Sequence, residues 1–394
     1  MTLLRPPILA LLALLALLAG CSSSPRAAPS TAVLNNAPDG VLTLPSRRCA
    51  NYFLLDVQLN GRGPFTMVLD TGASQTVVTP RVADLLKSDT RPANMYAEGS
   101  QGKRQDVDRV LSVRSLRIGD AEFRAFDAIT LDLSRIQATL GSPVDGILGA
   151  PAFADVLLTI DYPRSAIRVS HGALPPADGA RVHDLAAGDA PMIEARVAGK
   201  RRRFLLDTGK AGAISVRDFD RQIFANPPAT IAQGVAIGGS YILRAGRLAG
   251  DITLGDITFH HPVVESSDAS DLIGAEALKS FIVTLDLRHR RVSLVGPESA
   301  AGRTIAFPPI RGIGLGFDFT DGAWEVGKVF PGLPAEAVGI LPGDAVVRWG
   351  GKRLRELSCT RQQDLFTTGD SIDLTVIRRR QRMDFKVPII TLVP

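Results

Sequence analysis

The sequence predicts a mainly β protein, with two similar β lobes followed by a smaller C-terminal β module. The triplet Asp-Thr-Gly occurs at 70–72 and again at 207–209. Each copy directly follows an apolar, strand-like run, at 65–69 and at 204–206. After a Gly/Ala/Pro-rich break at 296–302, the pattern changes to short strands separated by Gly and Pro turns. These features together favour two related lobes and one unrelated module.

The triplets belong to a longer internal repeat. Three further pairs of segments match: 51–59 with 192–197, 116–120 with 252–256, and 147–161 with 272–286. The offset between the copies falls from 137 at the triplets (207 − 70) to 125 at the last pair (274 − 149). The first copy is therefore expected to hold extra residues, most simply around Leu131–Val144. A repeat of strands and turns on this scale predicts two lobes related by a pseudo-twofold axis.

The carboxylates of Asp70 and Asp207 are the candidate reactive groups. A single triplet would be weak evidence, because strand–turn junctions use Asp, Thr and Gly for turn chemistry alone. Two carboxylates brought together on a twofold axis cannot both ionise easily, so they share one proton. One can then act as a general base on water while the other donates a proton to a carbonyl oxygen. The pattern therefore indicates hydrolysis at a carbonyl carbon.

Residues 41–297 resemble the pepsin/retropepsin superfamily of aspartic proteases, with both halves of the site in one chain. The resemblance implies that Asp70 and Asp207 are the catalytic pair, acting on peptide or protein substrates without a cofactor or metal. Each remaining triplet residue also has an implied role. Threonine would form hydrogen bonds across the lobe interface, and glycine would allow close backbone approach beside the carboxylates; these supporting residues are Thr71, Gly72, Thr208 and Gly209.

The same resemblance assigns roles to two further pairs of segments. The hydrophobic–hydrophobic–Gly elements at 147–149 and 272–274 would brace the active-site loops. The Gly-rich turns at 98–102 and 238–240 would be the tips of two flap hairpins.

The second triplet departs from the family pattern, because Lys210 follows it where Ala73 follows the first. A lysine there either modulates the carboxylate pair by lowering its pKa values or extends to solvent. The alternative function is accordingly a protease-like binding protein with little or no activity. A serine hydrolase is not indicated, since no Gly-x-Ser-x-Gly element is present.

The first 40 residues predict an exported, lipid-anchored protein. Arg5 precedes the apolar run at 8–19, which is too short to span a membrane and fits a signal peptide. The run ends in Leu-Ala-Gly-Cys, which resembles a bacterial lipobox and implies lipidation of Cys21. Ser22 after the cysteine implies the outer membrane of a Gram-negative bacterium, with the protein facing the periplasm. The Ser/Pro/Ala-rich segment that follows is expected to be a flexible tether.

The C-terminal module resembles a bacterial PDZ domain. A Gly-Leu-Gly-Phe loop, formed by Gly314, Leu315, Gly316 and Phe317, matches the carboxylate-binding loop, and a Pro-Gly-Asp turn follows at 342–344. A PDZ groove binds the free C-terminus of a peptide as an added strand. Use of this module only for packing or as a lid stays open. The predicted organisation is a signal peptide at 1–20, a tether at 21–40, lobes at 41–172 and 173–297, and a PDZ domain at 303–394.

Charge and composition add few functional signals. The chain of 394 residues is 45% hydrophobic and has a net charge of +5. Its basic runs at 200–203, 288–291 and 378–380 are expected to be solvated hairpin tips, and no motif accompanies them that would indicate nucleic acid. Besides Cys21, only Cys49 and Cys359 are available for a disulfide, and their pairing stays open. The five histidines show no metal-binding spacing with cysteines.

Overall fold

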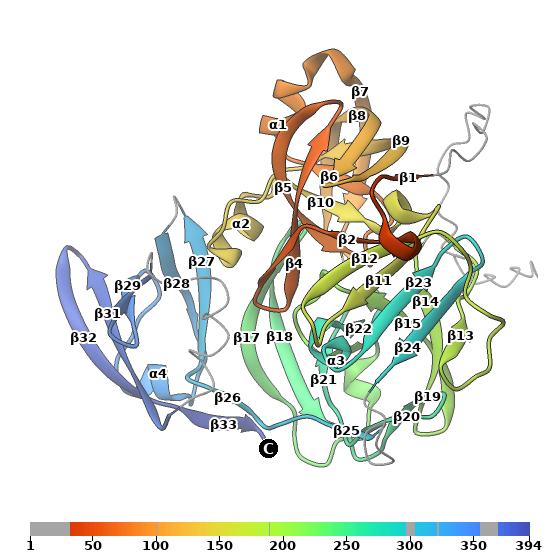
Figure 1. Ribbon diagram of the computed structural model, residues 1–394. Helices are drawn as coiled ribbons and strands as arrows, with labels where there is room; N and C mark the ends of the chain where they lie inside the picture. Colours follow the sequence, from red (N-terminus) through yellow and green to blue (C-terminus); the bar gives the residue numbers. More distant parts are fainter. Residues whose placement is uncertain (1–31, 100, 189, 297–303, 321–322, 355–368) are drawn as a thin grey trace, which may run out of the picture. The chain divides into compact units, whose positions relative to one another are not determined.

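The computed structural model describes residues 32–99, 101–188, 190–296, 304–320, 323–354 and 369–394, and they form a mainly β protein as predicted (Figure 1). The predicted signal peptide, Cys21 and Cys359 lie outside these residues. Among the described residues, no helix has the length and apolar character needed to cross a bilayer.

The first lobe is built on a nine-stranded sheet whose central order is β9-β6-β10-β5-β4. The strands of this sheet are β1 (Val33–Leu34), β3 (Ser46–Cys49), β4 (Tyr52–Leu59), β5 (Arg62–Asp70), β6 (Thr76–Val78), β7 (Thr90–Glu98), β8 (Arg104–Ile118), β9 (Ala121–Thr130) and β10 (Gly146–Gly149). The helical turns are η1 (Pro38–Gly40), α1 (Pro80–Leu85), η2 (Lys87–Asp89), α2 (Ser134–Leu140) and η3 (Ala150–Phe153). Helix α2 lies within the segment where the repeat predicts extra residues.

The second lobe repeats this arrangement in a ten-stranded sheet, whose central order β21-β16-β22-β15-β14 matches the first lobe strand for strand. Its strands are β14 (Met192–Val197), β15 (Lys200–Asp207), β16 (Ile214–Val216), β17 (Ala229–Ala236), β18 (Gly239–Arg247), β19 (Ile252–Leu254), β20 (Ile257–His260), β21 (Val263–Ser266), β22 (Asp271–Gly274) and β25 (Thr304–Ala306). Its helical turns are η4 (Phe219–Arg221) and α3 (Ala275–Leu278).

A third sheet joins the two lobes and contains strands from both. Its strands are β2 (Val41–Leu44), β11 (Leu157–Asp161), β12 (Ala166–Ser170), β13 (Val182–Asp184), β23 (Ile282–Asp286) and β24 (Arg291–Val295). At its centre β11 pairs antiparallel with β23, and Thr159 faces Thr284, its counterpart in the repeat. Their hydroxyl oxygens lie 3.0 Å apart. The pseudo-twofold axis therefore passes between these two threonines.

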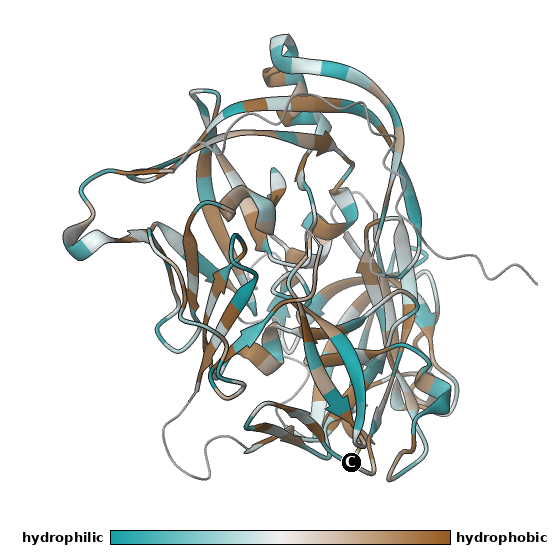
Figure 2. Ribbon diagram, turned by 90° about the vertical axis from the view of Figure 1, so that its right-hand side faces the viewer, coloured by the Kyte–Doolittle hydropathy of each residue, from teal (hydrophilic) through white to brown (hydrophobic). Residues whose placement is uncertain are grey.

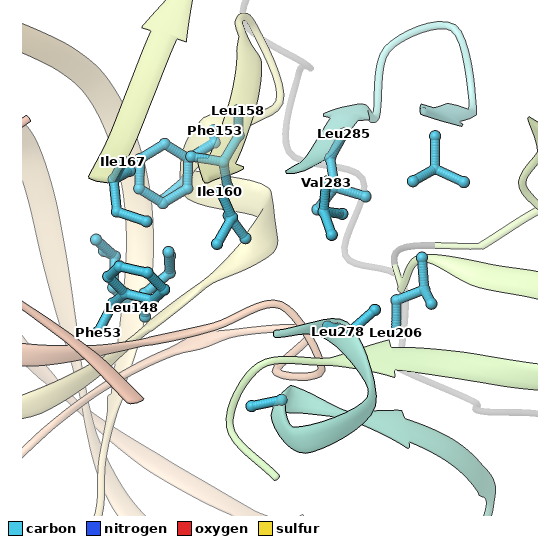
Figure 3. Packing of buried hydrophobic residues seen from close by; sticks show 14 of the residues in the cluster. Phe53, Leu148, Phe153, Leu158, Ile160, Ile167, Leu206, Leu278, Val283 and Leu285 are labelled. Atoms are coloured by element: carbon cyan, nitrogen blue, oxygen red, sulfur yellow. The ribbon is translucent and has the colours of Figure 1, made fainter. Parts of the chain in front are cut away.

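The hydrophobic core is continuous across the two lobes. Hydrophobic and hydrophilic residues alternate along many strands (Figure 2). In β14 every second side chain is buried. This alternation places one face of each strand in the core. One buried cluster contains Phe53 and Phe153 from the first lobe together with Leu206 and Leu278 from the second (Figure 3). The lobes thus share one core, as expected for two halves of a single folding unit.

The C-terminal module has its own sheet and core. Its strands are β26 (Ile310–Gly312), β27 (Leu315–Thr320), β28 (Ala323–Val329), β29 (Ala345–Trp349), β30 (Lys352–Arg353), β31 (Ser371–Arg378), β32 (Gln381–Pro388) and β33 (Ile390–Val393), with the short helix α4 (Pro334–Ala337). The main sheet has the order β27-β28-β29-β31-β32, so β27 is an edge strand. Trp349 is fully buried at the centre of this core.

Two of the predicted domain boundaries are wrong. The tether was placed at 21–40, but Ala32 is buried and β1 pairs with β9, so the folded first lobe begins about eight residues earlier than its predicted start at 41. The C-terminal module was placed from 303, but β25 adds a parallel strand to β20 of the second lobe. In both cases a short apolar segment supplies hydrogen bonds to an otherwise unpaired sheet edge.

The prediction that the basic runs are solvated hairpin tips is wrong for one arginine in each of two runs. Arg202 lies within β15 and binds the buried Asp271 carboxylate at 2.6 and 2.7 Å. Arg378 binds the buried Asp344 in the same bidentate way, at 2.6 and 2.7 Å. These arginines neutralise buried carboxylates, which would otherwise be costly to desolvate.

Cys49 is fully buried and disulfide-bonded, and its partner lies outside the described residues.

Candidate active site

Each candidate aspartate stands at the end of a central strand, held by a parallel neighbour. Asp70 ends β5 and faces Gly149 at the end of β10, whereas Asp207 ends β15 and faces Gly274 at the end of β22. A Cβ on Gly149 would come within 2.8 Å of the Ala73 carbonyl oxygen. These strands therefore pack tightly beneath the loops that follow the aspartates, which is the bracing arrangement expected from the sequence.

The structure brings Asp70 and Asp207 together, with each triplet glycine against the opposite carboxyl group. A Cβ on Gly72 would lie 2.6 Å from Cγ of Asp207, and one on Gly209 would lie 2.3 Å from Cγ of Asp70. No side chain fits at either position. Each carboxylate also accepts a 2.8 Å hydrogen bond from the backbone N–H of its own triplet glycine. Both aspartates are therefore fixed from the backbone and from across the interface.

Reciprocal hydrogen bonds of Thr71 and Thr208 hold the two loops together. The Thr71 hydroxyl donates to the Leu206 carbonyl at 2.6 Å, and the Thr208 hydroxyl donates to the Leu69 carbonyl at 2.9 Å. Each hydroxyl oxygen also accepts from the other threonine's backbone N–H, at 3.0 and 3.1 Å. Both side chains are buried. All four bonds cross the lobe interface.

The environment makes the two carboxyl groups unequal. Burial raises the pKa of Asp70 well above its usual range, and the charge of Asp207 raises it further. Burial raises the pKa of Asp207 as well, but a hydrogen bond from Asp70 and the positive charge of Lys210 oppose this rise. Both pKa values are raised, so the pair holds one proton, and the positive charge of Lys210 acts on the Asp207 side of the pair.

Lys210 does not extend to solvent. Its ammonium group forms an ion pair with Glu265 on β21, and the two side chains are only 12% and 13% exposed. Burial is the largest single effect and lowers the pKa of Lys210, but Glu265, Tyr241 and Asp207 together raise it above its usual value. The lysine therefore stays charged beside Asp207. In the first lobe the corresponding positions hold Ala73 and Ile129, so this ion pair belongs to one lobe only.

Several residues near the pair escaped the sequence analysis. Glu265 lies 55 positions beyond Lys210, and no local pattern signals it. Tyr52 and Tyr241 are close enough for the charge of Asp207 to raise the pKa of each phenol, which burial has already raised. The Asn51 amide donates to the Ala211 carbonyl at 2.8 Å and so links the first lobe to the loop after Lys210. The sequence signals nearest these groups are the matched strand beginning at 51 and the Gly-rich turn at 238–240, which directly precedes Tyr241.

The two Gly-rich turns are hairpin tips, as expected, and they meet. The β7–β8 hairpin contacts the β17–β18 hairpin where the Lys103 ammonium donates to the Ser240 carbonyl. A Cβ on Gly99 would come within 2.4 Å of the Ile237 carbonyl oxygen. Tyr241, one residue from this contact, interacts electrostatically with Lys210 and Asp207. The hairpin of the second lobe therefore reaches from the tip contact to the carboxylate pair.

The Gly-Leu-Gly-Phe loop lies at the start of the edge strand β27. It is far from both aspartates in the sequence, but it contacts the β17–β18 hairpin of the second lobe. Gly314 has a φ of +86°, which favours glycine, and Leu315 is buried. The amide of Gln233, on β17, donates to the Phe317 carbonyl at 3.0 Å and to the Asp318 carboxylate at 2.7 Å. A Cβ on Gly316 would lie 2.7 Å from Cβ of Gln233.

Comparison with protein families agrees with this geometry. Residues 55–152 match the aspartyl protease family model. The match contains the first triplet and ends before the second, so the second half of the site rests on the internal repeat and on the structure. A comparison with the curated proteins finds no match. The family match supports a peptidase.

We expect Thr71→Val to lower the free energy of unfolding by about 1–3 kcal/mol, because it leaves buried backbone groups of the opposite loop without partners. Urea denaturation measures this loss. Thr43→Val, at an exposed position of β2, is the matched control and should change stability by less than about 0.5 kcal/mol. Equal stability of the Thr71 variant and the wild type would show that the interface does not depend on this hydroxyl.

Proposed function

We propose that this protein is an aspartic endopeptidase whose Asp70/Asp207 pair activates water for attack on a peptide bond. The observation that carries the proposal is the contact of each carboxyl group with the opposite lobe's triplet glycine. This contact forces two buried carboxyl groups into one site, where they share a proton. Such a pair holds an acid and a base at one carbonyl group without a cofactor.

The different environments of the two aspartates indicate which acts as the base and which as the acid. Asp207 is the charged member and takes the proton of the attacking water, while Asp70 gives its proton to the carbonyl oxygen of the substrate. Water thereby adds to the carbonyl carbon to form a gem-diol. Return of the proton from Asp207 to the amide nitrogen, with the gem-diol proton passing back to Asp70, breaks the C–N bond and restores the pair. Lys210 supports this assignment because it stabilises the negative charge of Asp207.

We further propose that Cys21 is lipidated and holds the enzyme at the outer membrane, facing the periplasm. The lipobox-like ending of the signal-like segment supports this. Ala32 is buried and β1 pairs with β9, so about ten residues separate the proposed anchor from the folded lobe.

The C-terminal module is proposed to be a PDZ domain that binds the C-termini of substrates or partners. The left-handed Gly314 and the edge position of β27 support it, because a peptide would add as a strand to this edge. The Phe317 carbonyl on that strand already accepts a hydrogen bond from Gln233. A ligand that extends along β27 therefore competes with the flap hairpin of the second lobe. This competition would link ligand binding to the hairpin that reaches the carboxylate pair.

Asp70→Asn and Asp207→Asn should each lower the cleavage rate of a peptide library by at least about 10³-fold, since a shared-proton pair needs both members. Thermal unfolding should show that both variants stay folded. Asp120→Asn, at an exposed position, is the matched control and should cleave at the wild-type rate. Near-normal turnover in either site variant would refute the assignment, and absence of cleavage by the wild type would favour the protease-like binding protein.

Lys210→Met should move the alkaline limb of the pH–rate profile to higher pH. The ammonium lowers the pKa at which the pair loses its last proton, so without it the active, singly protonated form persists as pH rises. The double variant Lys210→Met/Glu265→Gln removes the ion pair without leaving a buried charge. It should also move the alkaline limb of the profile to higher pH. Lys87→Met, at an exposed lysine, should leave the profile unchanged. An unmoved limb in both site variants would show that Lys210 has no part in the chemistry.

The full-length chain should bind peptides that end in a free, apolar C-terminal residue, and amidation of that residue should abolish binding, because the loop binds a carboxylate. Fluorescence anisotropy with acid and amide forms of one peptide measures this. Gln233→Ala should tighten binding by removing the competing donor, whereas the exposed Gln58→Ala should not change it. Equal affinity for the two peptide forms would refute C-terminal recognition.

A further inference from the structure

A cluster of metal-ligating side chains lies on the second lobe, on strands other than those that carry the carboxylate pair. It consists of Asp251, His260 and His261, whose ligand atoms lie within 4.8 Å of one another. The strands β19 and β20 pair so that Ile252 faces Phe259. By the same register, Asp251, which precedes Ile252, lies opposite His260, which follows Phe259. His261 is the following residue.

Hydrogen bonds fix the orientation of the cluster. Asp251 Oδ1 lies 3.0 Å from Nδ1 of His260 and accepts a 3.0 Å hydrogen bond from the backbone N–H of His261. Nδ1 of His261 lies 3.1 Å from the Leu248 carbonyl oxygen. A carbonyl oxygen only accepts, so this Nδ1 carries the proton and, in the neutral ring, Nε2 keeps its lone pair. Metal-ligating histidines commonly have one ring nitrogen bonded to a backbone carbonyl in this way.

The types of ligand atom indicate which metal ion would bind, and the exposure of the side chains gives it access from solvent. Two imidazoles and one carboxylate suit zinc and similar transition metals, whereas magnesium and calcium prefer oxygen ligands. Asp251 is 38% exposed and His260 is 54% exposed, so an ion could enter from solvent. His261 has a left-handed φ of +39°, a conformation that is uncommon outside glycine and asparagine. This backbone bend places its ring edge-to-face with that of His260, at 4.4 Å between centroids.

We propose that Asp251, His260 and His261 bind one divalent transition metal ion, with zinc as the best match and water completing its coordination. The surrounding contacts indicate a structural role. His260 faces Ala306 of β25, which leads into the C-terminal module. Arg247 donates to the carbonyls of His261 and Phe307, at 2.9 and 3.1 Å, and to that of Pro394 at the chain end. An ion at the cluster would therefore stabilise the junction between the second lobe and this module.

The test uses the full-length chain after removal of metal with a chelator. Isothermal titration with zinc chloride should give one ion per chain, and cobalt(II) should give the visible absorption of a low-symmetry site. His260→Ala and His261→Asn should each weaken zinc binding at least tenfold; asparagine is chosen because it tolerates the left-handed backbone. Zinc should also raise the unfolding temperature of the wild type and not that of these variants.

Two controls separate this site from other histidines and from the proposed catalysis. His289→Ala removes a histidine that also contacts an aspartate, Asp286, and should bind zinc as the wild type does. Asp70→Asn should keep wild-type zinc affinity, because its carboxyl group is not part of the cluster. Absence of zinc binding by the wild type, or equal affinity in the wild type and both cluster variants, would overturn the proposal.

Discussion

The hydrogen bonds exchanged by Thr71 and Thr208 are the constraint on which the site depends. Two carboxyl groups repel each other when both are charged and are costly to desolvate, so the proton that they share does not by itself hold the two lobes together. The threonine bonds, the shared core and the sheet that joins the lobes hold the two loops against each other. The triplet glycines then set how closely the lobes approach. The contacts that stabilise this interface are thus the same contacts that bring the two carboxyl groups close enough to share a proton.

The two lobes have similar backbones, but the side chains beside the two aspartates differ. The same strands, registers and backbone hydrogen bonds support both aspartates, so a perfectly symmetric pair would have no preferred site for its proton. Lys210 and Glu265 remove this degeneracy, because they place a buried cation next to Asp207 where the first lobe has Ala73. Glu265 also keeps the lysine charged. The proposed assignment of Asp70 as the acid and Asp207 as the base rests on this asymmetry.

The sequence predicts the parts of the fold that repeat and misses those that depend on tertiary pairing. Asp70 and Asp207 could be found because their triplets occur twice at matching distances from matching strands. Glu265 could not, because its link to Lys210 exists only once β21 packs parallel to β16. The cluster around Asp251 has the same origin, since the pairing of β19 with β20 places Asp251 beside His260. The strands β1 and β25 were assigned to a tether and to the next module because a short edge strand has little pattern of its own.

The contact between Gln233 and the edge strand β27 connects the two halves of the proposed activity. Gln233 and Tyr241 lie on the two strands of one hairpin, whose tip contacts the opposite hairpin through Lys103. One face of this hairpin thus touches the proposed ligand groove, and its other strand reaches the environment of Asp207. Displacement of Gln233 by a bound C-terminus would release one of the contacts that hold the hairpin. A ligand of the C-terminal module could therefore change access to the carboxylate pair without touching it.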